Sequence, residues 1–143
     1  MPEKVPQENN PFMQNEILGR HYHIDFVTQL AGEYKMIGQA ISVNRLPEDT
    51  IAETANMPIR DVEQHVDEIA VAWERYFEEN EDQVLPEEAE RIFFRRLPDG
   101  LRDVAILGKG NLPVSAIARR IDRAEKSVLR KFESIQALRE KHL

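Results

Sequence analysis

Residues 46–69 read LPEDTIAETANMPIRDVEQHVDEI, and residues 112–135 read LPVSAIARRIDRAEKSVLRKFESI. Six residues of the first stretch return in the second at an offset of 66 positions. The pairs are Leu46 and Leu112, Pro47 and Pro113, Ile51 and Ile117, Ala52 and Ala118, Val62 and Val128, and Ile69 and Ile135. Each copy therefore predicts a short helix opened by proline, a tight turn, and a longer helix whose apolar side chains face the first.

The composition is typical of a helical protein whose stability comes from packing. The chain has 143 residues, of which 41% are hydrophobic and 31% charged, and it contains no cysteine. This length suits one domain or two small lobes with a shared core, and the lack of cysteine excludes disulfides and thiolate zinc sites. No apolar run approaches the roughly 20 residues of a membrane span. The start of the chain is polar rather than signal-like, so we expect a cytoplasmic protein without membrane contact.

The net charge of −7 hides a gradient along the chain. Residues 1–45 carry 4 Lys or Arg and 5 Asp or Glu, residues 46–100 carry 5 and 16, and residues 101–143 carry 10 and 5. Such an asymmetry indicates that one lobe suits an anionic partner and the other does not. The basic lobe contains the second copy of the repeat.

The apolar pattern predicts an all-α fold, because no segment shows the sustained alternation of a strand. A long N-terminal scaffold helix is expected from Ile24, where spacings of three and four place the next apolar residues on one face. These residues are Val27, Leu30, Tyr34, Ile37 and Ile41. We expect tandem helix-turn-helix units in two lobes, an acidic one at residues 15–83 and a basic one at residues 84–143. A flexible arm at residues 1–14 is expected to precede them.

A few local signals predict where the helices begin and end. Asn56 and Asp122 occupy the two predicted turns, and both residue types tolerate a left-handed backbone. Between the copies, we expect a solvated turn in the acidic run from Glu78 to Asp82, and then helices opening at Pro86 and Asp99. The buried side of the helix after Pro86 is expected to carry Ile92, Phe93 and Leu97.

The longer helix of the first copy carries a heptad pattern. Its apolar residues are Ile59, Val62, Val66, Ile69, Trp73 and Tyr76, with spacings of 3, 4, 3, 4 and 3. One interpretation is a stripe facing the core of the same chain. The other is a seam for a dimer or another partner helix.

These residues resemble the helix-turn-helix of bacterial and phage regulators, including the DNA-binding regions of sigma factors. The resemblance lies in Ile51-Ala52, Ala55-Asn56-Met57 and Val62, and in the equivalent residues of the second copy, Ile117-Ala118, Ile121-Asp122 and Val128. It covers about 24 residues in each copy. The chain departs from that pattern at Arg123, where an apolar residue is usual, and at the two turns, where glycine is usual.

The resemblance implies that the second helix of a unit enters the major groove, with positive side chains beside it on phosphates. The second copy offers a basic and polar set for that role: Arg119, Arg120, Arg123, Lys126, Ser127, Arg130 and Lys131. In the first copy, Arg60 stands among Asp61, Glu63, Asp67 and Glu68, which would repel DNA. We therefore expect the first copy to serve architecture or partner contact. A solvated basic face is the alternative interpretation of the second set.

Other chemistries have weaker support. His21 and His23 are close in sequence, but no second group of ligands accompanies them, so we expect no metal site and no cofactor. No glycine-rich phosphate loop is present, and the acidic runs are typical of solvated faces rather than of catalytic carboxylates. The expectation is that the chain is not an enzyme.

The sequence thus predicts a DNA-binding transcriptional regulator that reads duplex DNA through its basic C-terminal unit, as a homodimer or other homo-oligomer. Two alternatives stay open. One is an acidic helical adaptor that binds RNA polymerase or another regulator, and the other is a DNA-recognition component of phage packaging.

Overall fold

The computed structural model describes Leu18 and residues 24–142, and every regular element in this part of the chain is a helix. The all-α prediction is confirmed. The expected arm at residues 1–14 and the pair His21 and His23 lie outside the described residues. The helices, in chain order, are α2 (Ile24–Thr28), α3 (Gly32–Gly38), the π-helical turn η2 (Gln39–Val43), α4 (Glu48–Ala55), α5 (Ile59–Glu79), α6 (Glu81–Val84), α7 (Glu88–Arg96), α8 (Asp99–Lys109), α9 (Val114–Ile121) and α10 (Glu125–His142).

The repeat is present in three dimensions as two units of the same design. In the first unit, α3 and α4 pack on α5, and in the second, α8 and α9 pack on α10. Both short helices are preceded by proline in extended backbone and are followed by a left-handed residue, Asn56 (φ 56°) or Asp122 (φ 57°). Among the described non-glycine residues, the other positive φ values belong to Arg45 and Asn111, which are also 66 positions apart. The backbone therefore repeats its unusual conformations as well as its helices.

The left-handed turns give a direct test of the shared design. The left-handed conformation costs a residue with a Cβ about 1 kcal/mol or more in free energy, and asparagine and aspartate tolerate it better than alanine. We expect Asn56→Ala and Asp122→Ala each to lower the free energy of unfolding by about 1 kcal/mol in urea titrations. Asn44 is the matched control, because it is also exposed but has an ordinary φ of −87°. Equal losses at Asn44 and Asn56 would contradict this explanation.

The long N-terminal scaffold helix is a wrong prediction, because the segment is broken after Thr28. Ala31 is extended, and α3 begins at Gly32 with φ +58°, a conformation that glycine adopts without a steric cost. The apolar spacing survives the break, since Val27 and Ile37 are both buried in the core. Tyr34 does not follow it. Its side chain is 38% exposed, and its hydroxyl donates to Glu68 on α5.

The acidic run between the units is helical rather than a turn. Glu78 and Glu79 complete α5, and Glu81 and Asp82 form the first turn of α6. Acidic side chains in a first turn favour helix formation through the helix dipole. In α7 the expected burial of Phe93 and Leu97 is confirmed, but Ile92 is 39% exposed and Phe94 occupies the core instead.

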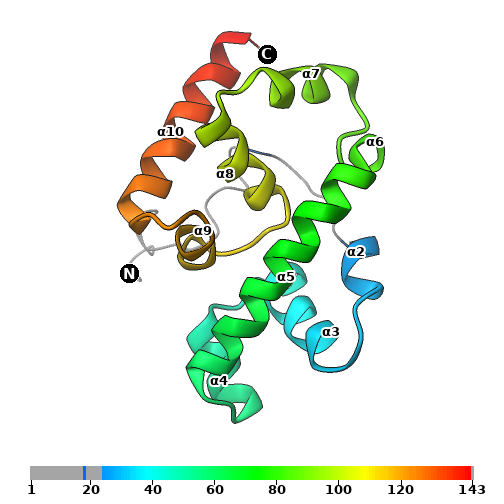
Figure 1. Ribbon diagram of the computed structural model, residues 1–143, viewed down its shortest axis with the longest axis vertical. Helices are drawn as coiled ribbons and strands as arrows, with labels where there is room; N and C mark the ends of the chain where they lie inside the picture. The colour runs from blue at the N-terminus through cyan, green and yellow to red at the C-terminus, as the bar shows by residue number, and fades with distance from the viewer. Residues whose placement is uncertain (1–17, 19–23, 143) are drawn as a thin grey trace, which may run out of the picture.

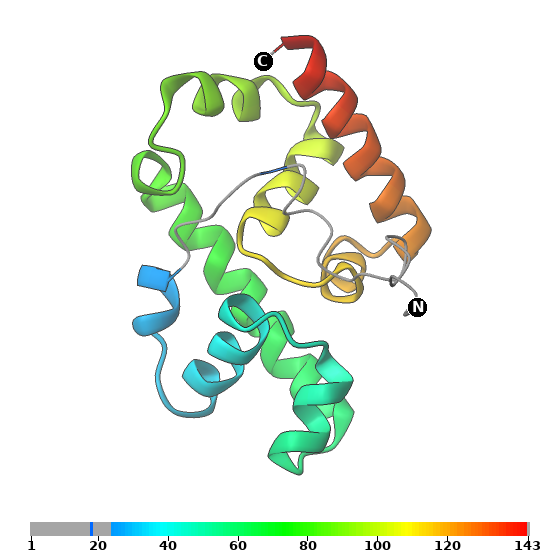
Figure 2. The same cartoon turned by 180° about the vertical axis from the view of Figure 1, so that it is seen from behind.

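Helix α5 runs through the middle of the molecule and belongs to the core of both units (Figures 1 and 2). It contacts α3 and α4 on one side and α8 and α9 on the other. The indole of Trp73, 1% exposed, lies at the centre and donates from Nε1 to the carbonyl of Ile106 over 2.7 Å. A Cβ at Gly110 would lie 2.7 Å from that nitrogen, so this position requires glycine.

The heptad pattern of α5 faces this core. Val62, Val66, Ile69 and Trp73 are at most 1% exposed, and Tyr76 is 9% exposed. Only Ile59, at 42%, reaches the surface among the six residues of the pattern. This corrects the interpretation of the pattern as a seam for a dimer or partner, because the chain's own helices α3, α4, α8 and α9 cover α5.

Two buried hydrogen bonds join the units where their equivalent loops meet. Ser42 Oγ donates to the carbonyl of Gly110 over 3.0 Å, and Asn111 Nδ2 donates to the carbonyl of Ser42 over 2.6 Å. Both side chains are 2% exposed. The expected boundary at residues 83 and 84 falls inside α6, which follows directly on the shared helix α5.

Candidate nucleic-acid interface

The seven expected DNA-binding residues fall into two groups in the structure. Arg119 and Arg120 lie in the last turn of α9 and turn towards α5 of the first unit. The other residues follow the left-handed turn at Asp122 and lead into the first half of α10. The sequence places all seven within a short stretch, but the fold directs them to different surroundings.

Arg119 is an internal tie between the two units. Its guanidinium forms a two-pronged contact with Glu48, with nitrogen–oxygen distances of 3.0 and 2.5 Å, and donates from Nε to Asp67 over 2.9 Å. The Glu48 side chain is only 6% exposed and also accepts from Ser115 Oγ over 2.9 Å. Burial by itself would lower the pKa of Arg119, but the hydrogen bonds to Glu48 and Asp67 outweigh it and raise the pKa. A permanently charged, neutralised arginine results.

Arg120 forms a second tie. Its Nη2 and Nε both contact the Glu74 carboxylate on α5, at 2.7 and 3.2 Å. Mainly these hydrogen bonds raise its pKa. The expectation that Arg119 and Arg120 contact DNA is therefore corrected, because carboxylates of the acidic lobe already neutralise them. Part of the charge gradient seen in the sequence holds the lobes together.

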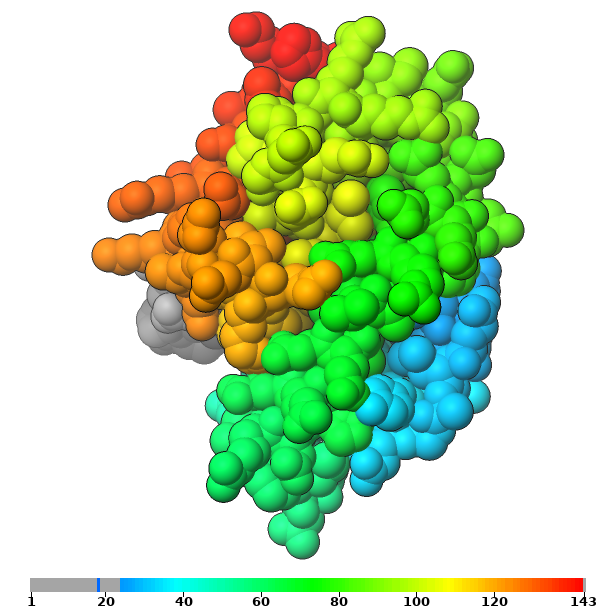
Figure 3. All heavy atoms as spheres, in the orientation of Figure 1, coloured from blue at the N-terminus to red at the C-terminus, as the bar shows by residue number. Residues whose placement is uncertain are grey.

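Four residues of the expected set remain outward. Arg123 lies in the turn before α10, and Lys126 and Arg130 follow on one face of the helix, one turn apart, with Ser127 beside them. Lys126 and Arg130 are exposed, and Ser127 is half-buried. Within the described part of the chain, none of these four side chains has an ion-pair partner; Arg123 donates to the carbonyl of Asp122 over 3.1 Å. Long side chains from the first turns of α10 project from the body in Figure 3.

Arg123, the departure from the family pattern, is accommodated by exposure. Its equivalent in the first unit, Met57, packs against the core, whereas Arg123 lies at the surface. Lys131 differs from its neighbours. It is half-buried, and its ammonium lies 3.4 Å from the position that a Cβ on Gly100 would take. Lys131 therefore lies against the start of α8 and is less available than the four outward residues.

The first unit presents a different surface at the equivalent positions. Arg60, Asp61 and Gln64 correspond to Lys126, Ser127 and Arg130. Arg60 and Gln64 are exposed, but Asp61 and the exposed Glu53 and Glu68 add negative charge to α4 and α5. A face of this composition is repelled by phosphates at close range.

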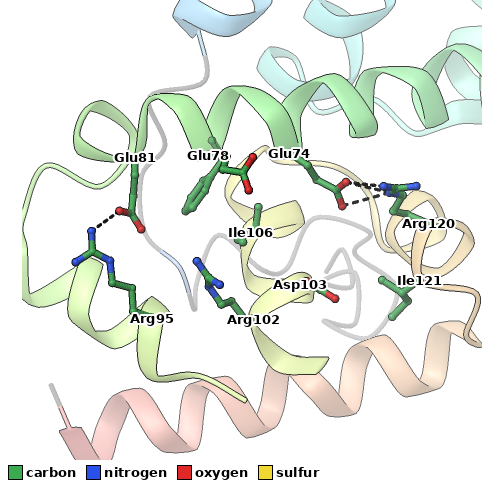
Figure 4. Close-up of a pocket in the computed structure, with 10 residues that line it drawn as sticks. Glu74, Glu78, Glu81, Arg95, Arg102, Asp103, Ile106, Arg120 and Ile121 are labelled. Carbon is green, nitrogen blue, oxygen red and sulfur yellow. Dashed lines mark hydrogen bonds and ion pairs between the residues drawn. The ribbon is translucent and has the colours of Figure 1, made fainter. Parts of the chain in front are cut away.

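A separate groove lies between α5 and the second unit. It has a volume of about 670 Å³ and is lined by charged side chains above a partly apolar floor (Figure 4). The lining residues are Glu74, Phe77, Glu78, Glu81, Arg95, Arg102, Asp103, Ile106, Arg120 and Ile121. These residues come from the five successive helices α5 to α9, so no local sequence signal indicates the groove.

Comparisons with models of protein families, with curated proteins and with solved structures find no match to this chain. None of the described helices has the length and apolar composition to cross a membrane. In the same part of the chain, no group of three or more His, Cys, Asp or Glu side chains is arranged to hold a metal ion.

Proposed function

We propose that the protein binds duplex DNA through its second helix-turn-helix unit, with α10 as the recognition helix. The observation that carries the proposal is the outward set Arg123, Lys126, Ser127 and Arg130. These side chains stand at the start of the second long helix, where side chains of such units meet base edges and phosphates. Their charge is not cancelled by acidic partners within the described residues.

The chemistry of the four side chains fits both parts of DNA recognition. Lysine and arginine neutralise phosphates and release counterions, which provides affinity without sequence preference. An arginine one turn further along the helix can also contact the O6 and N7 atoms of guanine, and serine accepts or donates to several bases. We assign phosphate contact to Arg123 and Lys126, and base contact to Ser127 and Arg130.

The first unit holds the second unit in position and does not act as a second DNA-binding unit. Its carboxylates Glu48, Asp67 and Glu74 fix Arg119 and Arg120 at the end of α9, directly before the turn that leads into α10. The position of the recognition helix thus depends on the acidic lobe. The dimer expected from the sequence loses its proposed seam, because those residues form the core.

The decisive experiment is a fluorescence anisotropy titration of a random duplex at two salt concentrations. We expect Lys126→Glu plus Arg130→Glu to weaken binding by about 100-fold at low salt and to lower the slope of log affinity against log salt by about 1, for the lost phosphate contact of Lys126. The half-buried Lys131 is left unchanged, so that a folding defect does not imitate the loss.

The matched control changes the equivalent positions of the first unit, Arg60→Glu plus Gln64→Glu. We expect this variant to keep most of the affinity of the unmodified chain, because α5 does not enter the groove of DNA. An affinity that is independent of salt, or an equal loss in both double variants, would contradict the proposal. Circular dichroism on each variant checks that the helices are retained.

A further inference from the structure

The groove between α5 and the second unit holds three arginines that differ in their partners. Arg95 pairs with Glu81 over 2.6 Å, and Arg120 pairs with Glu74 over 2.7 Å. Arg102 lies between them on α8, and its side chain forms no ion pair or hydrogen bond within the described residues. Figure 4 shows its guanidinium turned into the groove, without a contact, between the two paired arginines.

The unpaired state of Arg102 carries a free-energy cost. Its Nε atom is buried and has no acceptor. A buried donor without a partner loses the hydrogen bonds that water would otherwise supply, and this loss is unfavourable. The end of the guanidinium is turned into the groove, where a carboxylate could accept charge-assisted hydrogen bonds from its Nη atoms.

The rest of the groove decides which kind of carboxylate fits. Once the two ion pairs are set aside, Glu78 and Asp103 remain beside Arg102, and both are exposed in the lining. A simple anion would therefore meet a net negative wall, whereas a ligand with an ammonium group as well would contact both signs of charge. The floor offers apolar contact from Phe77, Ile106 and Ile121.

We propose that this groove binds a small zwitterion of the α-amino-acid class with an apolar side chain. Arg102 holds the carboxylate, Glu78 holds the ammonium group, and the side chain of the ligand lies on Phe77 and Ile106. The volume of about 670 Å³ is within the range of small-molecule sites. The site is distinct from the DNA-binding face on α10, and the proposal does not depend on DNA binding.

Trp73 provides a built-in reporter of this site. It is the single tryptophan of the chain, and its indole N–H donates to the carbonyl of Ile106, a residue that lines the groove. Ligand contact with Ile106 changes the surroundings of that hydrogen bond. The ¹⁵N–¹H signal of the indole in NMR spectra therefore follows binding without a label on the ligand.

The test titrates the full chain with L-phenylalanine, L-leucine and L-methionine at millimolar concentrations. Two analogues of phenylalanine accompany them, 3-phenylpropionate without the ammonium group and 2-phenylethylamine without the carboxylate. We expect saturable shifts of the indole signal with the three amino acids. Each analogue lacks one charged hydrogen bond, so we expect it to bind more weakly by about tenfold or more. No shift with any of the three amino acids would overturn the proposal, and so would equal binding of 3-phenylpropionate.

Two variants locate the ligand, each with a control from the same region. Arg102→Gln removes the carboxylate partner and Glu78→Gln removes the ammonium partner, and we expect each to weaken phenylalanine binding by about tenfold. Arg96→Gln and Glu79→Gln change exposed neighbours outside the groove and are expected to leave binding unchanged. Glu78 is itself exposed, so its substitution does not endanger folding. Unchanged affinity in both groove variants would overturn the site.

Discussion

Val66→Asp is expected to lower the free energy of unfolding by about 4 kcal/mol or more, because it places an unpaired carboxylate in the core. Val66 is fully buried on α5 between the two units. A domain of this size has a total stability of about 5–15 kcal/mol, so the substitution removes a large part of it. Thermal unfolding followed by circular dichroism measures the effect as a lower midpoint.

The same helix supplies the control for this prediction. Val71 is 42% exposed, so Val71→Asp introduces the same charge on the same helix without burying it. We expect that change to alter stability by about 0.5 kcal/mol or less. Sedimentation of both variants then separates a core from an association seam. A folded Val66→Asp chain that merely changes from dimer to monomer would show that the heptad pattern forms an interface after all.

Arg119→Ala is expected to lower the free energy of unfolding by about 3 kcal/mol. Removal of one partner from a buried ion pair leaves the other charge desolvated, which costs about 3–5 kcal/mol, and the lower end applies because the arginine side chain is 28% exposed. The stranded group is the Glu48 carboxylate, whose remaining contact is Ser115. Urea titration of the purified chain measures the loss.

Two further variants test the cause of that loss. Arg123→Ala removes a nearby exposed arginine and is expected to change stability by about 0.5 kcal/mol or less. Glu48→Val in the Arg119→Ala background is expected to recover stability, since Val114 occupies the equivalent position of the second unit and is buried there. If Arg119→Ala were as mild as Arg123→Ala, the tie between the units would contribute little.

The Arg119 variant also separates structure from DNA binding. At a temperature at which it remains folded, Arg119→Ala should keep the salt slope of the unmodified chain, because Arg119 is already neutralised by Glu48 and Asp67. The Lys126 and Arg130 variant should have a lower slope instead. The two effects have separate physical origins, and their separation reveals which arginines face the solvent.

Some features of the candidate site could be predicted from the sequence and others could not. Lys126 and Arg130 could be placed on one exposed face, because their spacing and the buried Val128 fix the orientation of the helix locally. The roles of Arg119 and Arg120 could not, since residues 46–71 positions away neutralise them. Composition alone counts positive charges but does not show which ones already have partners. The groove around Arg102 is hidden for the same reason, because its walls come from separate helices.

The sequence by itself determined the repeat and its boundaries. A proline precedes each short helix, and a left-handed residue, Asn56 or Asp122, follows it. These residues act through neighbouring backbone atoms, so a short stretch of sequence is enough to predict their effect. The tertiary structure alone decided which helices cover α5 and which groups pair with the carboxylates of the acidic lobe. Both depend on contacts between residues far apart in sequence: an apolar stripe has the same spacing whether its own chain or a partner covers it, and a carboxylate has the same charge whether it faces water or Arg119.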